Sequence, residues 1–199
     1  MFSAIDMEEH VVRPIGRRGE SRARVLEAAV KLFSENGVSG TSLRMIADEL
    51  GVTKAAVYHQ FASKEEIVLA VAQPAVDGLT SAADHAEQQS PPHARFDAAL
   101  EGLVAVVIQQ RASAVVIRDP VAARLLETHS QYRIALNRIQ DFLIGSEPTE
   151  EARIALALLG GSLFVSGTDP ALIAVGADRL RATLQETARN LLQPFRPPA

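Results

Sequence analysis

Residues 43–62 read LRMIADELGVTKAAVYHQFA and predict two short amphipathic helices joined at a single glycine. Apolar residues recur at helical spacing on one face of each helix: Ile46, Ala47 and Leu50 in the first, Val57 and Phe61 in the second. Gly51 separates the two helices, and glycine is the residue that most easily adopts the left-handed conformation that ends a helix. Thr53 follows and can cap the second helix through its hydroxyl. The spacing is typical of a helix-turn-helix motif.

The outer face of the second helix carries Lys54, Ala55, Tyr58, His59 and Gln60. In a helix-turn-helix protein, the N-terminal side chains of this helix reach base edges in the DNA major groove. Lys54 can donate to guanine O6 and N7 or to a phosphate, and Tyr58 offers a ring for a thymine methyl group. DNA binding is therefore the leading hypothesis. The motif has too little core to fold alone, so we expect further helices to support it.

The composition of the 199 residues fits a globular, all-helical protein of one or two domains. Hydrophobic residues make up 47% of the chain, which is enough for a substantial core. The chain has no cysteine, which excludes disulfides, thiolate metal sites and cysteine nucleophiles. No apolar run approaches the roughly 20 residues of a membrane helix, and the N-terminus lacks the apolar core of a signal peptide. We expect a cytoplasmic protein without a cofactor.

The net charge of −4 by itself argues against a general nucleic-acid binder. Its distribution is uneven, because residues 13–64 carry more Lys and Arg than Asp and Glu, whereas the remainder is acidic. A mildly basic head on an acidic body is consistent with DNA contact at one end only. Three arginines near the N-terminus, Arg13, Arg17 and Arg18, either contact the minor groove or phosphates, or belong to a disordered basic tail.

Helix start and stop signals divide the rest of the chain. Residues 1–20 lack periodicity and are expected to form a flexible arm. Outside the motif, helices are expected over residues 21–36, 64–89, 93–110, 120–126, 130–143, 149–166 and 178–192. Ser63 and Glu66 have the form of a capping box at the start of the long helix over 64–89. A proline in a helix interior removes a hydrogen bond, so this helix is expected to bend or split near Pro74 and Gly78.

From Arg22 to Val71 the chain resembles the N-terminal domain of TetR-family transcriptional repressors. The matching elements are Val25-Leu26-x-Ala28-Ala29-x-x-Leu32-Phe33, Gly37, Thr41-Ser42-Leu43, Ile46-Ala47, Leu50-Gly51-Val52, Val57-Tyr58-x-x-Phe61 and Lys64-Glu65-Glu66. The remainder resembles the family only in helix count and lengths. The resemblance implies an all-α protein of nine or ten helices. Residues 21–66 would form a three-helix helix-turn-helix DNA-binding head, and residues 67–199 an effector-binding and dimerisation domain.

The resemblance also implies which residues bind partners. The positions that commonly face double-stranded DNA are Arg44, Thr53, Lys54, Ala55, Tyr58, His59, Gln60 and Lys64, with Lys64 on a phosphate. The helices over 149–166 and 178–192 would pair across a two-fold axis in a homodimer, which implies a palindromic operator. Candidate interface residues are Gly160, Gly161, Phe164, Leu184 and Leu191. The glycine pair fits a close approach of two helices, but an intrachain packing contact explains it equally well.

By the same resemblance, a cavity for a small, largely apolar effector should lie among the helices over 93–143. Candidate lining residues are Phe96, Leu100, Val104, Val107, Ile108, Ile117, Leu125, His129, Tyr132 and Phe142. The alternative is that these side chains simply form the core. The effector would release a repressor from DNA by preferring a state with misplaced heads, and the helix that starts at Lys64 would act as the lever.

Two other classes of function remain open. An enzyme is disfavoured, because the five histidines show no metal-ligand spacing and the chain has neither a Gly-x-Ser-x-Gly elbow nor a phosphate-loop pattern. The other class is a helical protein-interaction or sensor module without specific DNA binding. The presence of Lys54, Tyr58 and Lys64 argues against such a module.

Overall fold

The computed structural model describes the backbone of residues 18–196 and most of their side chains. Every regular element in this range is helical, which confirms the all-α prediction. The helices are α1 (Arg18–Gly40), α2 (Leu43–Leu50), α3 (Lys54–Tyr58), α4 (Lys64–Glu87), α5 (Pro92–Gln109), α6 (Arg111–Arg118), α7 (Pro120–Thr128), α8 (Ser130–Ile144), α9 (Glu150–Thr168), α10 (Pro170–Ile173) and α11 (Ala177–Leu192), followed by a 3-10 turn, η1 (Gln193–Phe195). Leaving out the two shortest, α3 and α10, nine helices remain, in agreement with the expected nine or ten.

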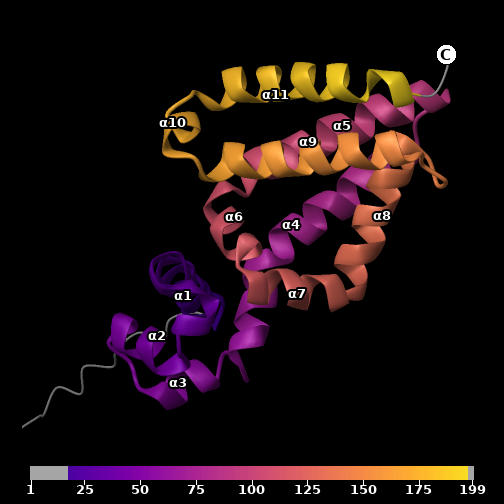
Figure 1. Cartoon of the computed structure of the whole chain (residues 1–199). Coiled ribbons are helices and arrows are strands. Elements are labelled where there is room, and N and C mark those ends of the chain that lie inside the picture. Colours follow the sequence, from indigo (N-terminus) through magenta and orange to yellow (C-terminus); the bar gives the residue numbers. More distant parts are fainter. Residues whose placement is uncertain (1–17, 197–199) are drawn as a thin grey trace, which may run out of the picture.

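The molecule has a small head and a larger helical body (Figure 1). Helices α1 to α3 form the head, and α4 leaves it to run into the body, where it packs against α5 and α8. Helices α9 and α11 lie side by side along the far side of the body and are linked through α10. Within residues 18–196, no helix is both long and apolar enough to cross a membrane.

The hydrophobic core of the head extends into the body. Its members come mainly from α1 to α4, but Val116 of α6 and Ala122 of α7 belong to the same buried cluster. A second cluster joins α4, α5, α8, α9 and α11 inside the body. Because apolar burial is the main stabilising contribution to folding, the shared cluster fixes α6 and α7 directly against the head.

The helices expected from the sequence did not include α6, and of the two alternatives expected near Pro74, a bend or a split, the split was wrong. The residues between Gln110 and Asp119 form the helix α6, which was not predicted because it is short and has no side-chain cap at its N-terminus. The long helix α4 is not split at Pro74 but continues through it. Proline removes one backbone hydrogen bond, and the packing of α4 against α5 and α8 offsets this loss. The N-terminal arm predicted over 1–20 falls largely outside the described residues, together with Arg13, Arg17 and the side chain of Arg18, but α1 already begins at Arg18.

Gly78 has a packing role in the crossing of α4 and α5. A Cβ atom at Gly78 would lie 2.8 Å from Cγ2 of Val106, which is too close for two carbon atoms. Gly102 of α5 shows the same restriction, since its Cβ would lie 2.4 Å from Cβ of Ala82 on α4. The two glycines therefore allow the helices to approach closely, and Gly78 lies within continuous helix.

Candidate nucleic-acid interface and ligand cavity

The local geometry of residues 42–61 is that of a helix-turn-helix. The Ser42 hydroxyl caps α2 by accepting a hydrogen bond from the Met45 backbone N–H at 3.2 Å. Gly51 ends α2 with φ 64°, in the left-handed region predicted for it. The Thr53 hydroxyl then caps α3 by accepting from the Ala56 N–H at 3.2 Å. Both caps satisfy backbone N–H groups that a helix start leaves without a partner.

The inward stripe predicted for the motif is buried except for Leu50, which is half-buried against the same cluster. Ile46 and Ala47 of α2, and Val57 and Phe61 in and after α3, are each at most 1% exposed. They belong to the head cluster with α1 and the first turns of α4. The guanidinium of Arg22 on α1 lies 3.9 Å from the centroid of the Phe61 ring and donates to the Gln60 carbonyl at 2.8 Å. Arg22 thus joins α1 to the end of α3, a role that its place on α1 did not reveal.

The outer face of α3 presents most of the predicted DNA-facing residues to solvent. Lys54, Ala55, Tyr58 and His59 are exposed, with Tyr58 at 47% of its surface. The ammonium of Lys54 lies 5.3 Å from the centroid of the Tyr58 ring, so the two side chains share one surface. Thr53, Arg44 and Gln60 lie around this group: Thr53 and Arg44 are exposed, and Gln60 is half-buried.

Lys64 has an environment different from that of Lys54. Its Nζ atom donates to the backbone carbonyls of Val38 at 2.6 Å and Thr41 at 2.9 Å, and lies 3.5 Å from that of Ser39. Val38 and Ser39 belong to the last turn of α1, after the non-helical Gly37, and Thr41 to the connection to α2; we refer to this segment as the α1–α2 turn. Because an ammonium group has three hydrogens to donate, Lys64 is occupied by the head's own backbone rather than directed outward.

The junction of α6 and α7 also contacts this turn. Asp119 accepts hydrogen bonds from the backbone N–H of Val38 and from that of Val121, each at 2.8 Å. Burial is the largest single influence on this carboxyl and by itself would raise its pKa. The N–H groups and the charge of Lys64 together outweigh burial, so the pKa of Asp119 lies below its usual range. Asp119 is therefore an ionised link between the body and the head.

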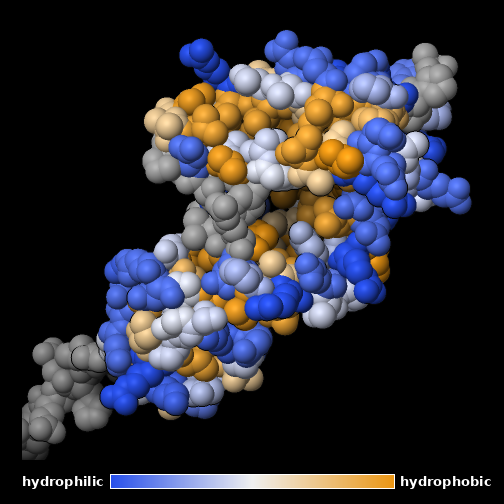
Figure 2. Space-filling model, in the orientation of Figure 1, coloured by the Kyte–Doolittle hydropathy of each residue, from blue (hydrophilic) through white to orange (hydrophobic). Residues whose placement is uncertain are grey.

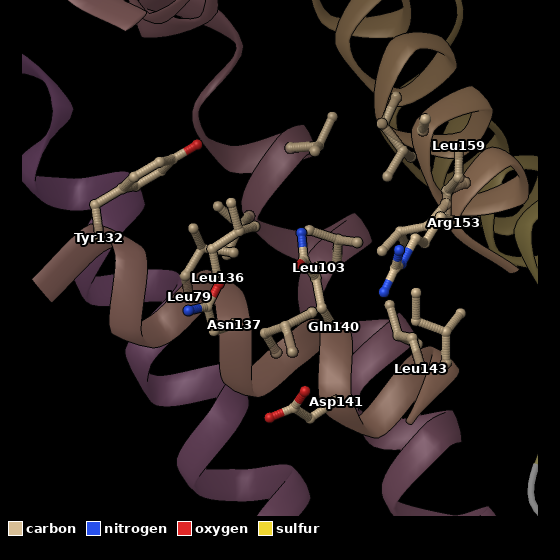
Figure 3. A pocket seen from close by; sticks show the side chains of 18 of the residues that line it. Leu79, Leu103, Tyr132, Leu136, Asn137, Gln140, Asp141, Leu143, Arg153 and Leu159 are labelled. Atoms are coloured by element: carbon tan, nitrogen blue, oxygen red, sulfur yellow. The ribbon is translucent and has the colours of Figure 1, made fainter. Parts of the chain in front are cut away.

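The body contains a cavity of about 810 Å³. Figure 2 shows the corresponding hollow below α9, with hydrophobic residues at its edge. The walls come from α4, α5, α6, α8, α9 and the loop between α8 and α9. Most lining side chains are apolar, among them Leu79, Leu103, Leu136, Leu143 and Leu159 (Figure 3). The size and the apolar walls are typical of a small-molecule site.

Three of the predicted lining residues, Val107, Ile117 and Tyr132, line this cavity. The other predicted residues do not line the cavity, because their side chains pack against other parts of the body. Phe96, Leu100, Val104 and Ile108 are buried on the core side of α5, and Phe142 packs against the same cluster. Leu125 lines a smaller hollow of about 320 Å³ beside Lys64. His129 lies at the N-terminus of α8, where its Nδ1 is 3.5 Å from the Tyr132 N–H.

The cavity also has polar lining residues that sequence reasoning missed. Asn137, Gln140 and Asp141 come from α8, and Arg153 comes from the first turn of α9 (Figure 3). A polar residue on an amphipathic helix is usually solvated, so no local signal separates these from other surface side chains. Burial, and to a smaller extent the charge of Glu127, raise the pKa of Tyr132, so its hydroxyl stays protonated.

The candidate interface helices present an apolar stripe to solvent. On α9, Ile154 is 60% exposed, Leu158 62% and Val165 42%. Ideal Cβ atoms at Gly160 and Gly161 would meet no described atom within 4 Å, so the chain gives no support to an intrachain packing role for this pair. Leu184 and Leu191 of α11 are half-buried against the body core, and the side chain of Phe164 lies outside the described part.

Residues 25–71 match the family described as bacterial regulatory proteins, tetR family. Over these residues, the head of the chain is similar to the TetR family. The transcriptional repressor KstR2 of Mycobacterium tuberculosis is 43% identical over 56 residues, which are 28% of each chain. The transcriptional activator FasR of Mycolicibacterium smegmatis is 42% identical over 64 residues, 32% of this chain and 29% of FasR. The match therefore spans less than a third of each of these relatives.

The TetR-family fold extends over the body as well. The solved structure of the ketosteroid transcriptional regulator KstR2 of Mycobacterium tuberculosis superposes with a TM-score of 0.64 and covers 94% of this chain and 98% of that one. Its sequence identity is 22%, so this likeness concerns the fold. The relatives are named as transcriptional regulators, which agrees with the prediction that this chain is not an enzyme.

Proposed function

We propose that this chain is a sequence-specific DNA-binding transcriptional regulator. The observation that carries the proposal is the exposed outer face of α3, where Lys54 and Tyr58 share one surface while the inner face is fully buried. A rigid helix with free polar side chains is what entry into a major groove requires. The head over 21–66 would bind DNA and the remainder would sense and dimerise, with α4 crossing the boundary between them.

The proposal includes a homodimer on a palindromic operator in the cytoplasm. The exposed stripe of Ile154, Leu158 and Val165 supports it, because a contiguous apolar surface in water favours association. Two symmetric copies would place their two α3 helices on half-sites one helical turn, or a multiple of it, apart.

We further propose that a small ligand in the cavity releases the protein from DNA. Ile117 of α6 lines the cavity, and Asp119 at the end of the same helix accepts the Val38 N–H in the head. A ligand that changes the position of α6 therefore acts on the head through the hydrogen bond of Asp119 and through Val116, which belongs to the buried cluster of the head. Coupling between two sites of this kind is typically about 1–3 kcal/mol. One relative is named a repressor and another an activator, so the names of the relatives do not decide between the two roles. Repression is therefore part of the proposal.

The test is a genomic pull-down with the full chain, followed by footprinting of the enriched fragments. The expected result is a small set of fragments that share a pseudo-palindrome, protected on two half-sites. The double variant Lys54→Ala, Tyr58→Ala should fold and lose the enrichment, because both side chains are exposed. Recovery of fragments without any shared sequence would contradict the proposal and favour a protein-interaction or sensor module.

A further inference from the structure

We propose that the cavity binds an amphipathic organic anion, with the acidic group of the ligand on Arg153 and its apolar part against the leucine-rich walls. This inference rests on the proposed ligand-responsive function and adds the chemical class of the ligand. It is carried by the composition of the lining, by the unpaired charge of Arg153 and by the place of Tyr132.

The walls of the cavity define an apolar body for the ligand. Leu79 of α4, Leu103 of α5 and Leu136 of α8 face the same space from three helices (Figure 3). A space of about 810 Å³ with such walls favours a molecule of drug-like size that leaves water for an apolar surface.

Arg153 is the cationic residue among the described lining residues. Figure 3 shows its guanidinium directed into the space between α9 and α8. No carboxylate of the described residues lies within ion-pair distance of it, whereas Arg138 and Arg189 in the same body are paired with carboxylates at 2.7 Å and 3.3 Å. The one carboxylate of the lining, Asp141, points away from Arg153 (Figure 3). Arg153 is thus free to pair with an anion that enters the cavity.

Tyr132 supplies a second polar contact on the opposite side of the cavity. Figure 3 shows its hydroxyl pointing away from α8, with the leucine side chains between it and Arg153. The residue is half-buried, and it is one of the residues that line the cavity. A ligand that spans the two positions would carry an acidic group at one end and a hydroxyl or carbonyl near the other.

The pairing should separate an anion from a neutral molecule of the same shape. A hydrogen bond between two charged groups is about twice as strong as a neutral one, and it strengthens when the ligand displaces water from the cavity. The guanidinium can bind a carboxylate or sulfonate through two parallel N–H groups. A neutral isostere would gain the apolar contact alone.

The experiment compares two fluorescent probes that share a ring system, the anionic 1-anilinonaphthalene-8-sulfonate and the neutral N-phenyl-1-naphthylamine. We expect the full chain to bind the anion about tenfold more tightly than the neutral probe. Dodecanoate should displace the anionic probe at a lower concentration than 1-dodecanol. Arg153→Gln should remove this preference and leave the affinity for the neutral probe unchanged.

Two further variants test whether the probes bind inside the cavity. Arg133→Gln changes an exposed arginine of α8 outside the lining, and it should keep the preference for the anion. Leu136→Trp fills part of the cavity and should weaken the binding of both probes. The inference is overturned if the full chain binds both probes equally, if Arg153→Gln keeps the preference, or if Leu136→Trp leaves binding intact. These binding measurements need no DNA. A failure of the DNA pull-down would therefore be a separate result from a failure of this inference.

Discussion

At the scale of single residues, Lys54 and Lys64 show how different the environments of two lysines in one motif can be. Lys54 begins α3 and is exposed beside Tyr58, with no carboxylate of the described residues in an ion pair with it. Lys64 begins α4 and donates to the carbonyls of Val38 and Thr41. The first is therefore available to DNA, and the second holds the turn between α1 and α2 in place.

Lys54→Ala should weaken binding to the operator by about tenfold or more, because a good base contact is worth roughly 1–3 kcal/mol. If Lys54 instead contacts a phosphate, the weakening should be the same on all sequences, and the slope of log affinity against log salt should fall by about 0.9. Titration of labelled operator and of unrelated DNA at several salt concentrations measures both quantities. Lys31→Ala is the matched control: Lys31 lies on α1 and forms an exposed ion pair with Glu49 of α2. Unchanged affinity on both DNAs would exclude a DNA contact of Lys54.

Lys64→Ala should lower the free energy of unfolding by about 1–3 kcal/mol, because several carbonyls lose a charged donor in a half-buried position. Urea denaturation followed by circular dichroism measures the change. Lys31→Ala again serves as the control and should unfold like the unmodified chain. Stability equal to that control would show that the carbonyls find other partners and that the ammonium is free for DNA.

At the scale of elements, the α6–α7 junction connects the cavity to the head. Asp119 ends α6, caps α7 and accepts the Val38 N–H that lies beyond the break in α1. Gly37 forms this break with φ 72°, and a Cβ there would lie 3.3 Å from Oδ2 of Asp119. The close approach of the carboxylate therefore depends on a glycine in the left-handed region.

Asp119→Asn should destabilise the chain by about 1–2 kcal/mol at neutral pH, because a charged acceptor of two N–H groups becomes neutral. The pKa of Asp119 is lowered by folding, so its contribution is complete above the pKa of the unfolded chain and is lost as the pH falls through the lower folded value. The difference in unfolding free energy between the two proteins should therefore shrink below about pH 4. Urea denaturation at pH 7 and at acid pH tests this.

The same variant also tests the link between ligand and DNA. With Asp119→Asn, the ligand should bind the cavity as before but lower DNA affinity less than in the unmodified chain. Asp178→Asn provides a matched control, since Asp178 is exposed at the start of α11. Full release of DNA by the ligand in Asp119→Asn would show that the coupling follows another path, such as α4.

At the scale of the whole molecule, the stripe on α9 is the surface that most needs a partner. Leu158 is 62% exposed and Ile154 is 60% exposed, although both are large and apolar. Figure 2 shows the hydrophobic surface gathered over α9, on the side of the body away from the head. Pairing through this surface would leave both heads free.

Leu158→Glu should convert the proposed dimer to a monomer, because two copies would bring buried carboxylates together without partners. Sedimentation equilibrium at micromolar concentration measures the oligomeric state. Ile134→Glu changes an equally exposed residue on α8, at 57%, and should remain dimeric. A Leu158→Glu protein that still sediments as a dimer would place the interface on another surface.

The head could be predicted nearly in full because its signals are local. Gly51 and the hydroxyls of Ser42 and Thr53 act on backbone groups a few residues away, so their spacing in the chain is enough to place the helix ends. The buried stripes of α2 and α3 follow from helical periodicity for the same reason. The first residues of the long helices α4, α5 and α9 likewise lie close to their predicted positions.

The sequence by itself thus determined most of the long helices, the helix-turn-helix and the resemblance of the head to the TetR family, since these depend on neighbours along the chain. Only the tertiary structure decided that Lys64 faces the α1–α2 turn, that Asp119 joins body to head, and that Arg153 rather than Phe96 meets the cavity. The walls of the cavity come from helices far apart in sequence, and every amphipathic helix has several neighbours that its apolar face can meet. Which neighbour it meets depends on the packing of the whole body, and helical periodicity carries no information about that choice.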